Sequence, residues 1–260
     1  MLKKYLSLFL LAGTLLTSLP GMARISDAEA MNMAGLQRSL TQRMAKDYLM
    51  LGAEVRVDVA ERQLQETIER FQASQQALQA YAPNVAIRDA LNAVDGTWAG
   101  YRRLLEDKPQ ADRALEVLET GEQLLQQTQA VTDLMAEHHG AMGAMVNRAG
   151  WARVQTQRIA MLYMAKAWRV PAADLDVALD QSVRDFEGIL KELEARGAPN
   201  EEIASAQRRA RAHWSFTLKG IDLHASQEFV PTMVTVSTDS LFRQLNELTR
   251  LYAGLDAGDS

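Results

Sequence analysis

The sequence repeats one motif, and this repeat constrains the fold more than any other feature. Residues Asn32–Tyr48 return as Asn147–Tyr163, with every shared residue 115 positions later. The shared residues are an asparagine, an Ala-Gly pair, an arginine, a Thr-Gln-Arg triplet, an alanine and a tyrosine. An internal repeat indicates duplicated structural units, and this spacing is far longer than the roughly 20–50 residues of a solenoid unit. Each copy is therefore predicted to be a small domain of its own.

The rest of the chain has the composition and periodicity of amphipathic helices. It is rich in Ala, Leu, Gln, Glu and Arg, and apolar residues recur every three or four positions, as in Leu64, Ile68 and Phe71. This spacing places them on one face of a helix. Only six prolines interrupt the chain, and they mark turns because proline cannot continue a helix. The predicted helices are 27–53, 57–81, 85–105, 111–137, 141–168, 172–196, 200–227 and 232–253.

These segments predict an all-α protein of two tandem four-helix bundles joined by a long or kinked helix, because four helices are the simplest closed way to bury four apolar stripes. The predicted domains are 24–138 and 139–260. The join contains Gly140 and Gly143, and each weakens a helix by about 1 kcal/mol relative to alanine. A break there would let the bundles fold back side by side, whereas a continuous helix would stack them end to end. We expect the continuous or gently kinked helix.

Residues 1–23 have the features of a cleaved signal peptide. Lys3 and Lys4 precede an apolar run, 5–19, and the Gly-Met-Ala sequence ending at Ala23 suits signal peptidase. An uncleaved membrane anchor is the alternative, but the run is short for a span of about 20 residues. The mature chain is therefore expected in the periplasm. Its lack of cysteine fits that compartment, since no thiol is left to oxidise.

Composition and motifs exclude several classes of function. The formal charge of −5 and pI near 5.5 argue against nucleic acid as a partner. No nucleophile–base pair, glycine-rich phosphate loop or paired carboxylates with recognisable spacing suggest an enzyme, and no cofactor is expected. His138 and His139 are adjacent and point about 100° apart, so they do not ligate one ion. His213 and His224 share a helix face without other ligands, which leaves a metal or haem bundle as a remote alternative.

On a helix, the repeated motif separates into an apolar face and a stripe of small and polar residues. Glycine in the stripe lets another helix approach closely. The arginine supplies a planar, permanently charged donor fork suited to a carboxylate or a trigonal oxyanion, and the amides add neutral donors. The candidate ligand-binding residues are therefore Asn32, Gly35, Arg38 and Gln42 in the first copy and Asn147, Gly150, Arg153 and Gln157 in the second.

A structural role is the alternative for Arg38 and Arg153, which would then pair with acidic residues of neighbouring helices. The return of the whole constellation, glycine included, favours ligand binding. Arg43 and Arg158 follow five residues later, about 140° around the helix. They face elsewhere and are expected to form structural salt bridges.

The run Asn-x-Ala-Gly-x-x-Arg-x-x-x-Gln-Arg resembles the ligand-binding helix of the PilJ-type sensor domain. This domain occurs in type IV pilus methyl-accepting chemotaxis transducers and NarX-type nitrate/nitrite sensor kinases. The resemblance covers the two motif segments and is only topological elsewhere. It implies a four-helix bundle that dimerises through its first helix, with an arginine of each partner holding one nitrate. By motif position these arginines are Arg38 and Arg153, beside Gly35 and Gly150.

The chain also departs from that family. No transmembrane, HAMP, kinase or methyl-accepting segment follows the second copy, so the resemblance supports ligand binding rather than transduction by this chain alone. We expect an exported, non-enzymatic sensory protein that binds a small oxyanion such as nitrate or nitrite and acts with a membrane-bound sensor or transducer partner. The alternative is a helical scaffold that binds a membrane receptor or pilus component.

The position of the two arginines in space depends on the join. If the helix runs through the join, a rise of about 1.5 Å per residue keeps the motifs tens of ångströms apart. Each motif would then need its counterpart from a second chain, giving a homodimer with up to two sites. If the helix breaks, Arg38 and Arg153 meet within one chain and bind one anion. We expect the homodimer.

Overall fold

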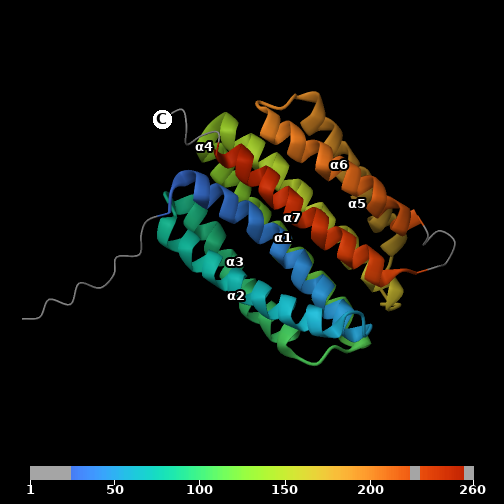
Figure 1. The fold of residues 1–260 in the computed structure, drawn as a ribbon. Coiled ribbons are helices and arrows are strands. Elements are labelled where there is room, and N and C mark those ends of the chain that lie inside the picture. Colours follow the sequence, from blue (N-terminus) through green and yellow to red (C-terminus); the bar gives the residue numbers. More distant parts are fainter. Residues whose placement is uncertain (1–24, 223–228, 255–260) are drawn as a thin grey trace, which may run out of the picture.

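The computed structural model of the chain describes residues 25–222 and 229–254, and of residues 139–145 only the backbone. The predicted signal peptide lies outside these residues. No described helix is long and apolar enough to cross a membrane. Within the described residues the protein is all-helical (Figure 1), with seven helices: α1 (Asp27–Gly52), α2 (Val57–Tyr81), α3 (Val85–Glu106), α4 (Ala111–Ala167), α5 (Leu175–Ala195), α6 (Glu201–Asp222) and α7 (Pro231–Gly254).

The helix boundaries follow local signals in the sequence. Ser26 and Glu29 form a capping box that satisfies backbone donors at the start of α1. Asn84 caps α3, and Asn200 makes the matching bond 116 residues later, each accepting from a backbone N–H at 2.9 Å. The helical segments are close to those predicted from the sequence, except that two of them are joined in α4.

Helix α4 is one run of helical residues, but it reverses direction near its middle. Asn147 Nδ2 donates to Asp133 Oδ1 at 3.1 Å, and Arg158 pairs with Glu122. In a straight helix, Asn147 would lie about 21 Å from Asp133. The two halves therefore lie side by side and antiparallel. In Figure 1 the middle of α4 lies at one end of the molecule, and both halves run back from it.

The reversal divides the protein into two four-helix bundles. We call α1, α2, α3 and the first half of α4 (111–138) module 1, and the second half of α4 (146–167) with α5, α6 and α7 module 2. Their cores correspond: the Phe71 and Trp98 rings lie 4.4 Å apart, and the Phe186 and Trp214 rings 4.5 Å apart. The predicted pair of bundles is confirmed. The expected end-to-end stacking is wrong, because the modules lie side by side.

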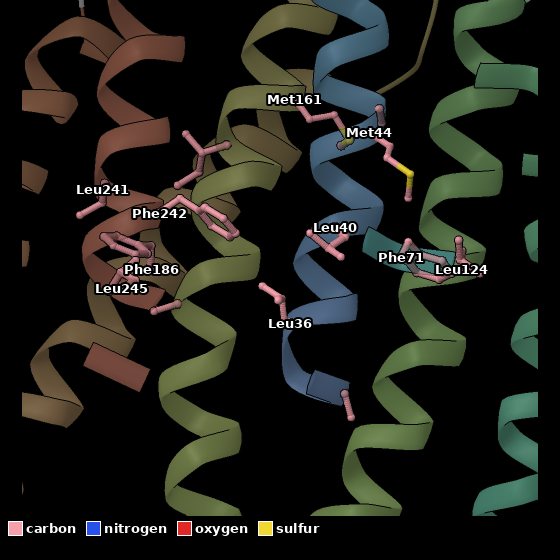
Figure 2. Packing of buried hydrophobic residues seen from close by; sticks show 14 of the residues in the cluster. Leu36, Leu40, Met44, Phe71, Leu124, Met161, Phe186, Leu241, Phe242 and Leu245 are labelled. Carbon is pink, nitrogen blue, oxygen red and sulfur yellow. The ribbon is translucent and has the colours of Figure 1, made fainter. Parts of the chain in front are cut away.

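The modules meet along α1 and the second half of α4, which we call the seam. Figure 2 shows α1 between the two halves of α4, with Leu124 on one half and Met161 on the other. Every residue of α1 from Ala34 to Gln42 is buried, polar residues included. A helix covered on all sides needs partners on two faces. End-to-end stacking would have left one face of α1 in water, which explains the side-by-side arrangement.

Candidate functional site

The two repeated motifs meet at the seam, where the glycines make room for the arginines. A Cβ added to Gly150 would lie 2.9 Å from Arg38 Nη2 and 3.1 Å from Arg153 Nη2. A Cβ added to Gly35 would lie 3.0 Å from Arg153 Nη2 and 3.4 Å from Arg38 Nη2. Any side chain at Gly35 or Gly150 would therefore crowd both guanidinium groups. This is the physical reason for a glycine inside each helix.

The two guanidinium groups are close together and buried. Because both Nη2 atoms lie within 3.1 Å of one Cβ position on Gly150, they are at most about 6 Å apart. Arg38 is 0% and Arg153 1% exposed, and neither forms an ion pair with another described residue. Two like charges at this distance repel by roughly 2–3 kcal/mol at an effective dielectric constant of 20. The pKa of each is lowered to about 9; burial is the main cause, and for Arg153 the positive charges of Arg38 and Arg70 contribute to the fall.

Arg38 is held by module 1 and by the backbone of the other motif. Its Nη1 donates to Gln129 Oε1 at 2.6 Å, and its Nη2 donates to the Asn147 carbonyl at 3.2 Å. Its guanidinium carbon lies 5.3 Å over the ring of Trp151, a cation–π contact. The negative charge of Asp133 raises its pKa against the effect of burial. Arg38 is thus restrained on several sides.

Arg153 is held less completely. Its Nη1 donates to Asn32 Oδ1 at 3.0 Å and to Asn246 Oδ1 at 3.2 Å. Its Nε and Nη2 are buried and have no hydrogen-bond partner among the described residues. A buried donor without a partner costs about 1–3 kcal/mol, and more when it is charged. The unpaired donors of Arg153 therefore face the space between the motifs with unused binding capacity.

The structure separates the remaining candidates. Asn32 and Asn147 each contact the arginine of the opposite motif. Gln42 is buried and donates to Thr41 Oγ1 and, at 3.5 Å, to the Gly121 carbonyl. Gln157 is buried with neither amide atom hydrogen-bonded among the described residues. Neither glutamine bonds an arginine, so the polar stripe extends beyond the guanidinium pair.

The expectation that Arg43 and Arg158 form structural salt bridges is confirmed: Arg158 pairs with Glu122 across the two halves of α4, and Arg43 pairs with Asp47 within α1. Arg43 Nε lies 3.9 Å from Asp47 Oδ2, and its guanidinium lies over the Phe242 ring at 5.3 Å. Both side chains therefore support packing between helices rather than the guanidinium pair.

Sequence reasoning missed Gln129 and Asn246, which hold the two arginines from the last helix of each module. They occupy matching places: Gln129 lies three residues before Thr132, and Asn246 three residues before Thr249. A polar amide on an otherwise apolar helix face, repeated 117 residues later, was the available signal. It lay outside the motif on which the prediction was based.

The expected separation of the two motifs by tens of ångströms is wrong. Helix α4 folds back, so Arg38 and Arg153 meet within one chain. The homodimer was expected only because separated motifs would need a second chain, and this reason no longer applies. One chain supplies both sides of the arrangement that the resemblance assigned to two partners.

This arrangement suits a small anion more than any other ligand. Two guanidinium groups offer planar donor forks, which match the oxygens of a carboxylate or a trigonal oxyanion. An anion between them would remove their mutual repulsion and accept hydrogen bonds from the unpaired donors of Arg153. Among the described residues no group of three or more His, Asp or Glu side chains is placed to hold a metal ion.

A comparison with known protein families finds a match that covers the first copy of the repeat. Residues 24–132 match the PilJ family, described as "Type IV pili methyl-accepting chemotaxis transducer N-term". This region is therefore similar to the N-terminal domain of that family. The match covers most of module 1 and does not extend to the second copy. No curated protein and no solved structure is significantly similar to the chain.

Proposed function

We propose that the protein is a sensory subunit that binds one small oxyanion per chain, nitrate or nitrite, between Arg38 and Arg153. The similarity of residues 24–132 to the PilJ family of chemotaxis transducers supports a role in sensing. The observation that carries the ligand class is the guanidinium pair: two buried arginines at most about 6 Å apart, without an ion pair among the described residues. A protein tolerates such repulsion where a ligand of opposite charge offsets it.

The ligand donors are divided unequally between the modules. Arg153 offers Nε and Nη2, which have no partner among the described residues, whereas Arg38 already uses Nη1 and Nη2. The anion is therefore held chiefly by Arg153, and Arg38 supplies charge from the opposite side. The predicted signal peptide supports a place in the periplasm, where dissolved nitrate and nitrite would reach the protein.

Calorimetric titration of the mature protein with nitrate, nitrite and sulfate tests this proposal. We expect one trigonal anion to bind per chain. Ligand linkage should then raise the free energy of unfolding by about 2.7 kcal/mol at a hundredfold excess over Kd, and the melting temperature should rise with it. Arg38→Ala combined with Arg153→Ala should abolish both signals. No binding of any oxyanion by the folded parent protein would refute the proposal.

The matched control is Arg148→Gln. Arg148 lies on the same helix as Arg153, but its Nε bonds Glu192 at 2.5 Å. This variant removes one positive charge near the site without touching the guanidinium pair. It should keep the parent affinity, so a loss in the Arg148 variant would mean that general positive charge, not the pair, attracts the anion.

A further inference from the structure

Module 2 has an apolar groove of about 650 Å³ between α6 and α7. Its walls include Phe216, Met233 and Val236. Phe216 is 54% exposed and Val236 47% exposed, although both are large apolar side chains. Clustered apolar side chains in a groove mark an interaction site more often than single ones scattered over a surface.

Module 1 shows that the fold does not require apolar side chains here. Aligning Trp98 with Trp214 places Gly100 at the position of Phe216. Aligning Leu124 with Leu241 places Glu116 and Glu119 at the positions of Met233 and Val236. Both glutamates are exposed. The same face of the same bundle is polar in module 1, so the apolar groove is particular to module 2.

The hollow has a similar origin. Tyr101 is fully buried in module 1, and its hydroxyl would lie 2.9 Å from a Cβ on Gly121. The matching residue in module 2 is the shorter Thr217, whose hydroxyl donates to the His213 carbonyl and also bonds Ser237. Leu104 is likewise replaced by Gly220. The end of Met233, which lines the groove, occupies the space beside Gly220, since a Cβ added there would lie 3.2 Å from Met233 Cε. A groove-lining side chain thus takes the place that Leu104 fills in module 1.

The described lining of the groove carries positive charge and no carboxylate. Among the described residues that line it, the only one with a permanent charge is Arg243; the ring nitrogens of His213 face Ser237 and Gln244. Arg243 is exposed and forms no ion pair with another described residue. It also lines the adjoining hollow together with Arg209 and Glu247, and the carboxylate of Glu247 bonds Arg250. An unpaired cation therefore lies at one end of an apolar surface.

We propose that this groove binds an amphipathic helix of a partner protein, with an apolar ridge facing Phe216, Met233 and Val236 and an acidic residue facing Arg243. A groove between two helices accepts the apolar face of a third, read as anchors at i, i+3, i+4 and i+7. The cation selects acidic over basic flanks, because a like charge at an interface disfavours the wrong partner.

Fluorescence anisotropy with labelled designed peptides tests the proposal. One 18-residue peptide carries a leucine ridge flanked by glutamates, a second has the same ridge flanked by lysines, and a third is a scramble of the first. We expect the acidic peptide to bind at least about tenfold more tightly than the other two. Phe216→Gln with Val236→Glu should weaken its binding about tenfold or more, and Arg243→Gln should remove the preference for glutamate.

Val85→Glu is the matched control. Val85 is 66% exposed but belongs to module 1, so this variant adds the same charge away from the groove and should bind like the parent. If the double variant fails to fold, Arg243→Glu tests the proposal by itself. This variant should bind the lysine-flanked peptide more tightly than the glutamate-flanked one. Three results would overturn the proposal: equal binding of all three peptides, a protein dimer that Val236→Glu dissociates, or recruitment to phosphatidylglycerol vesicles through the groove.

The groove and the anion site can fail separately. The variant with Arg38→Ala and Arg153→Ala should still bind the acidic peptide, because neither arginine lines the groove. The variant with Phe216→Gln and Val236→Glu should still bind nitrate for the same reason.

Discussion

Arg38 and Arg153 hold equivalent positions in the two modules, but their surroundings differ. Arg38 lies against Trp151 and bonds Gln129 and the Asn147 carbonyl, with Asp133 nearby. Arg153 has a leucine, Leu36, where Arg38 has the tryptophan, and two of its nitrogens are unpaired among the described residues. The duplication thus kept the glycine and the arginine and changed what restrains them. One module supplies a fixed cation, and the other supplies free donors.

The largest effect should come from substituting the two arginines separately. Arg153→Met should weaken nitrate binding by a factor of about a hundred or more, since truncating one partner of a buried charged pair costs about 2–5 kcal/mol. Arg38→Met should cost less, because Arg38 has fewer free donors. Titration calorimetry measures both affinities. Equal losses would show that the modules contribute equally and would break the comparison.

The same variants should have the opposite effect without anion. Replacing one buried arginine by an apolar residue removes the repulsion, and such replacements stabilise proteins by up to about 1–4 kcal/mol. Arg153→Met should therefore melt at a higher temperature than the parent in anion-free buffer and at a lower one in saturating nitrate. A variant less stable in both buffers would mean that the arginine serves packing.

The next prediction concerns stability and compares the C-terminal ends of the two motifs. Lys46 and Asp47 of module 1 are buried, whereas module 2 has Met161 and Leu162 there. Lys46 Nζ bonds Asp239 Oδ1 of α7 at 2.6 Å and lies 3.1 Å from Asp47 Oδ1. Burial raises the pKa of Asp47 to about 6, although Lys46 and Arg43 lower it and Asp239 adds to the rise. Lys46, joined by Gln63, keeps the pKa of Asp239 below its ordinary value despite burial.

The two carboxylates should therefore respond to pH with opposite signs. A raised pKa means that the folded state prefers the protonated acid, so the stability cost of ionised Asp47 grows as the pH rises from about 4 and is complete above about pH 6. Asp47→Asn should raise the free energy of unfolding at pH 7 by about 1–3 kcal/mol, and the gain should vanish near pH 4. Asp239→Asn should lower stability at pH 7, with the loss shrinking below pH 4. Urea unfolding across this range measures both, and a pH-independent effect of Asp47→Asn would contradict the assigned pKa.

The smallest effect concerns the glycines. Gly150→Ala places a methyl group about 3 Å from both Nη2 atoms, so the guanidinium groups must shift by a few tenths of an ångström. We expect nitrate affinity to fall several-fold while helix propensity adds up to about 1 kcal/mol of stability. Gly188→Ala is the control, because a methyl group there meets nothing within 4 Å. It should gain the stability without the loss of affinity.

Much of the fold was predictable because its signals are local. The capping serine before α1 and the Asn84–Asn200 correspondence lie within one turn of the helices they start. The reversal of α4 was not, because residues around Gly140 and Gly143 have helical backbone conformations on both sides of the fold-back. Direction in space is decided by what covers α1, and that is a long-range property.

The candidate site divides in the same way. Arg38, Arg153 and the two glycines could be found because the motif repeats them together. Gln129 and Asn246 come from helices distant in sequence, and only packing brings them to the arginines. The unequal pairing of the two guanidinium groups depends on those neighbours, so the repeat alone could not predict it.

The fold-back of α4 has a consequence for how the protein behaves at low abundance and over evolutionary time. A site shared by two identical chains disappears on dilution, whereas covalent linkage holds the two halves at a fixed effective concentration. In a symmetric dimer, every mutation also strikes both sides of the axis at once. Here each side mutates alone, so one arginine can acquire a tryptophan neighbour while the other keeps its leucine.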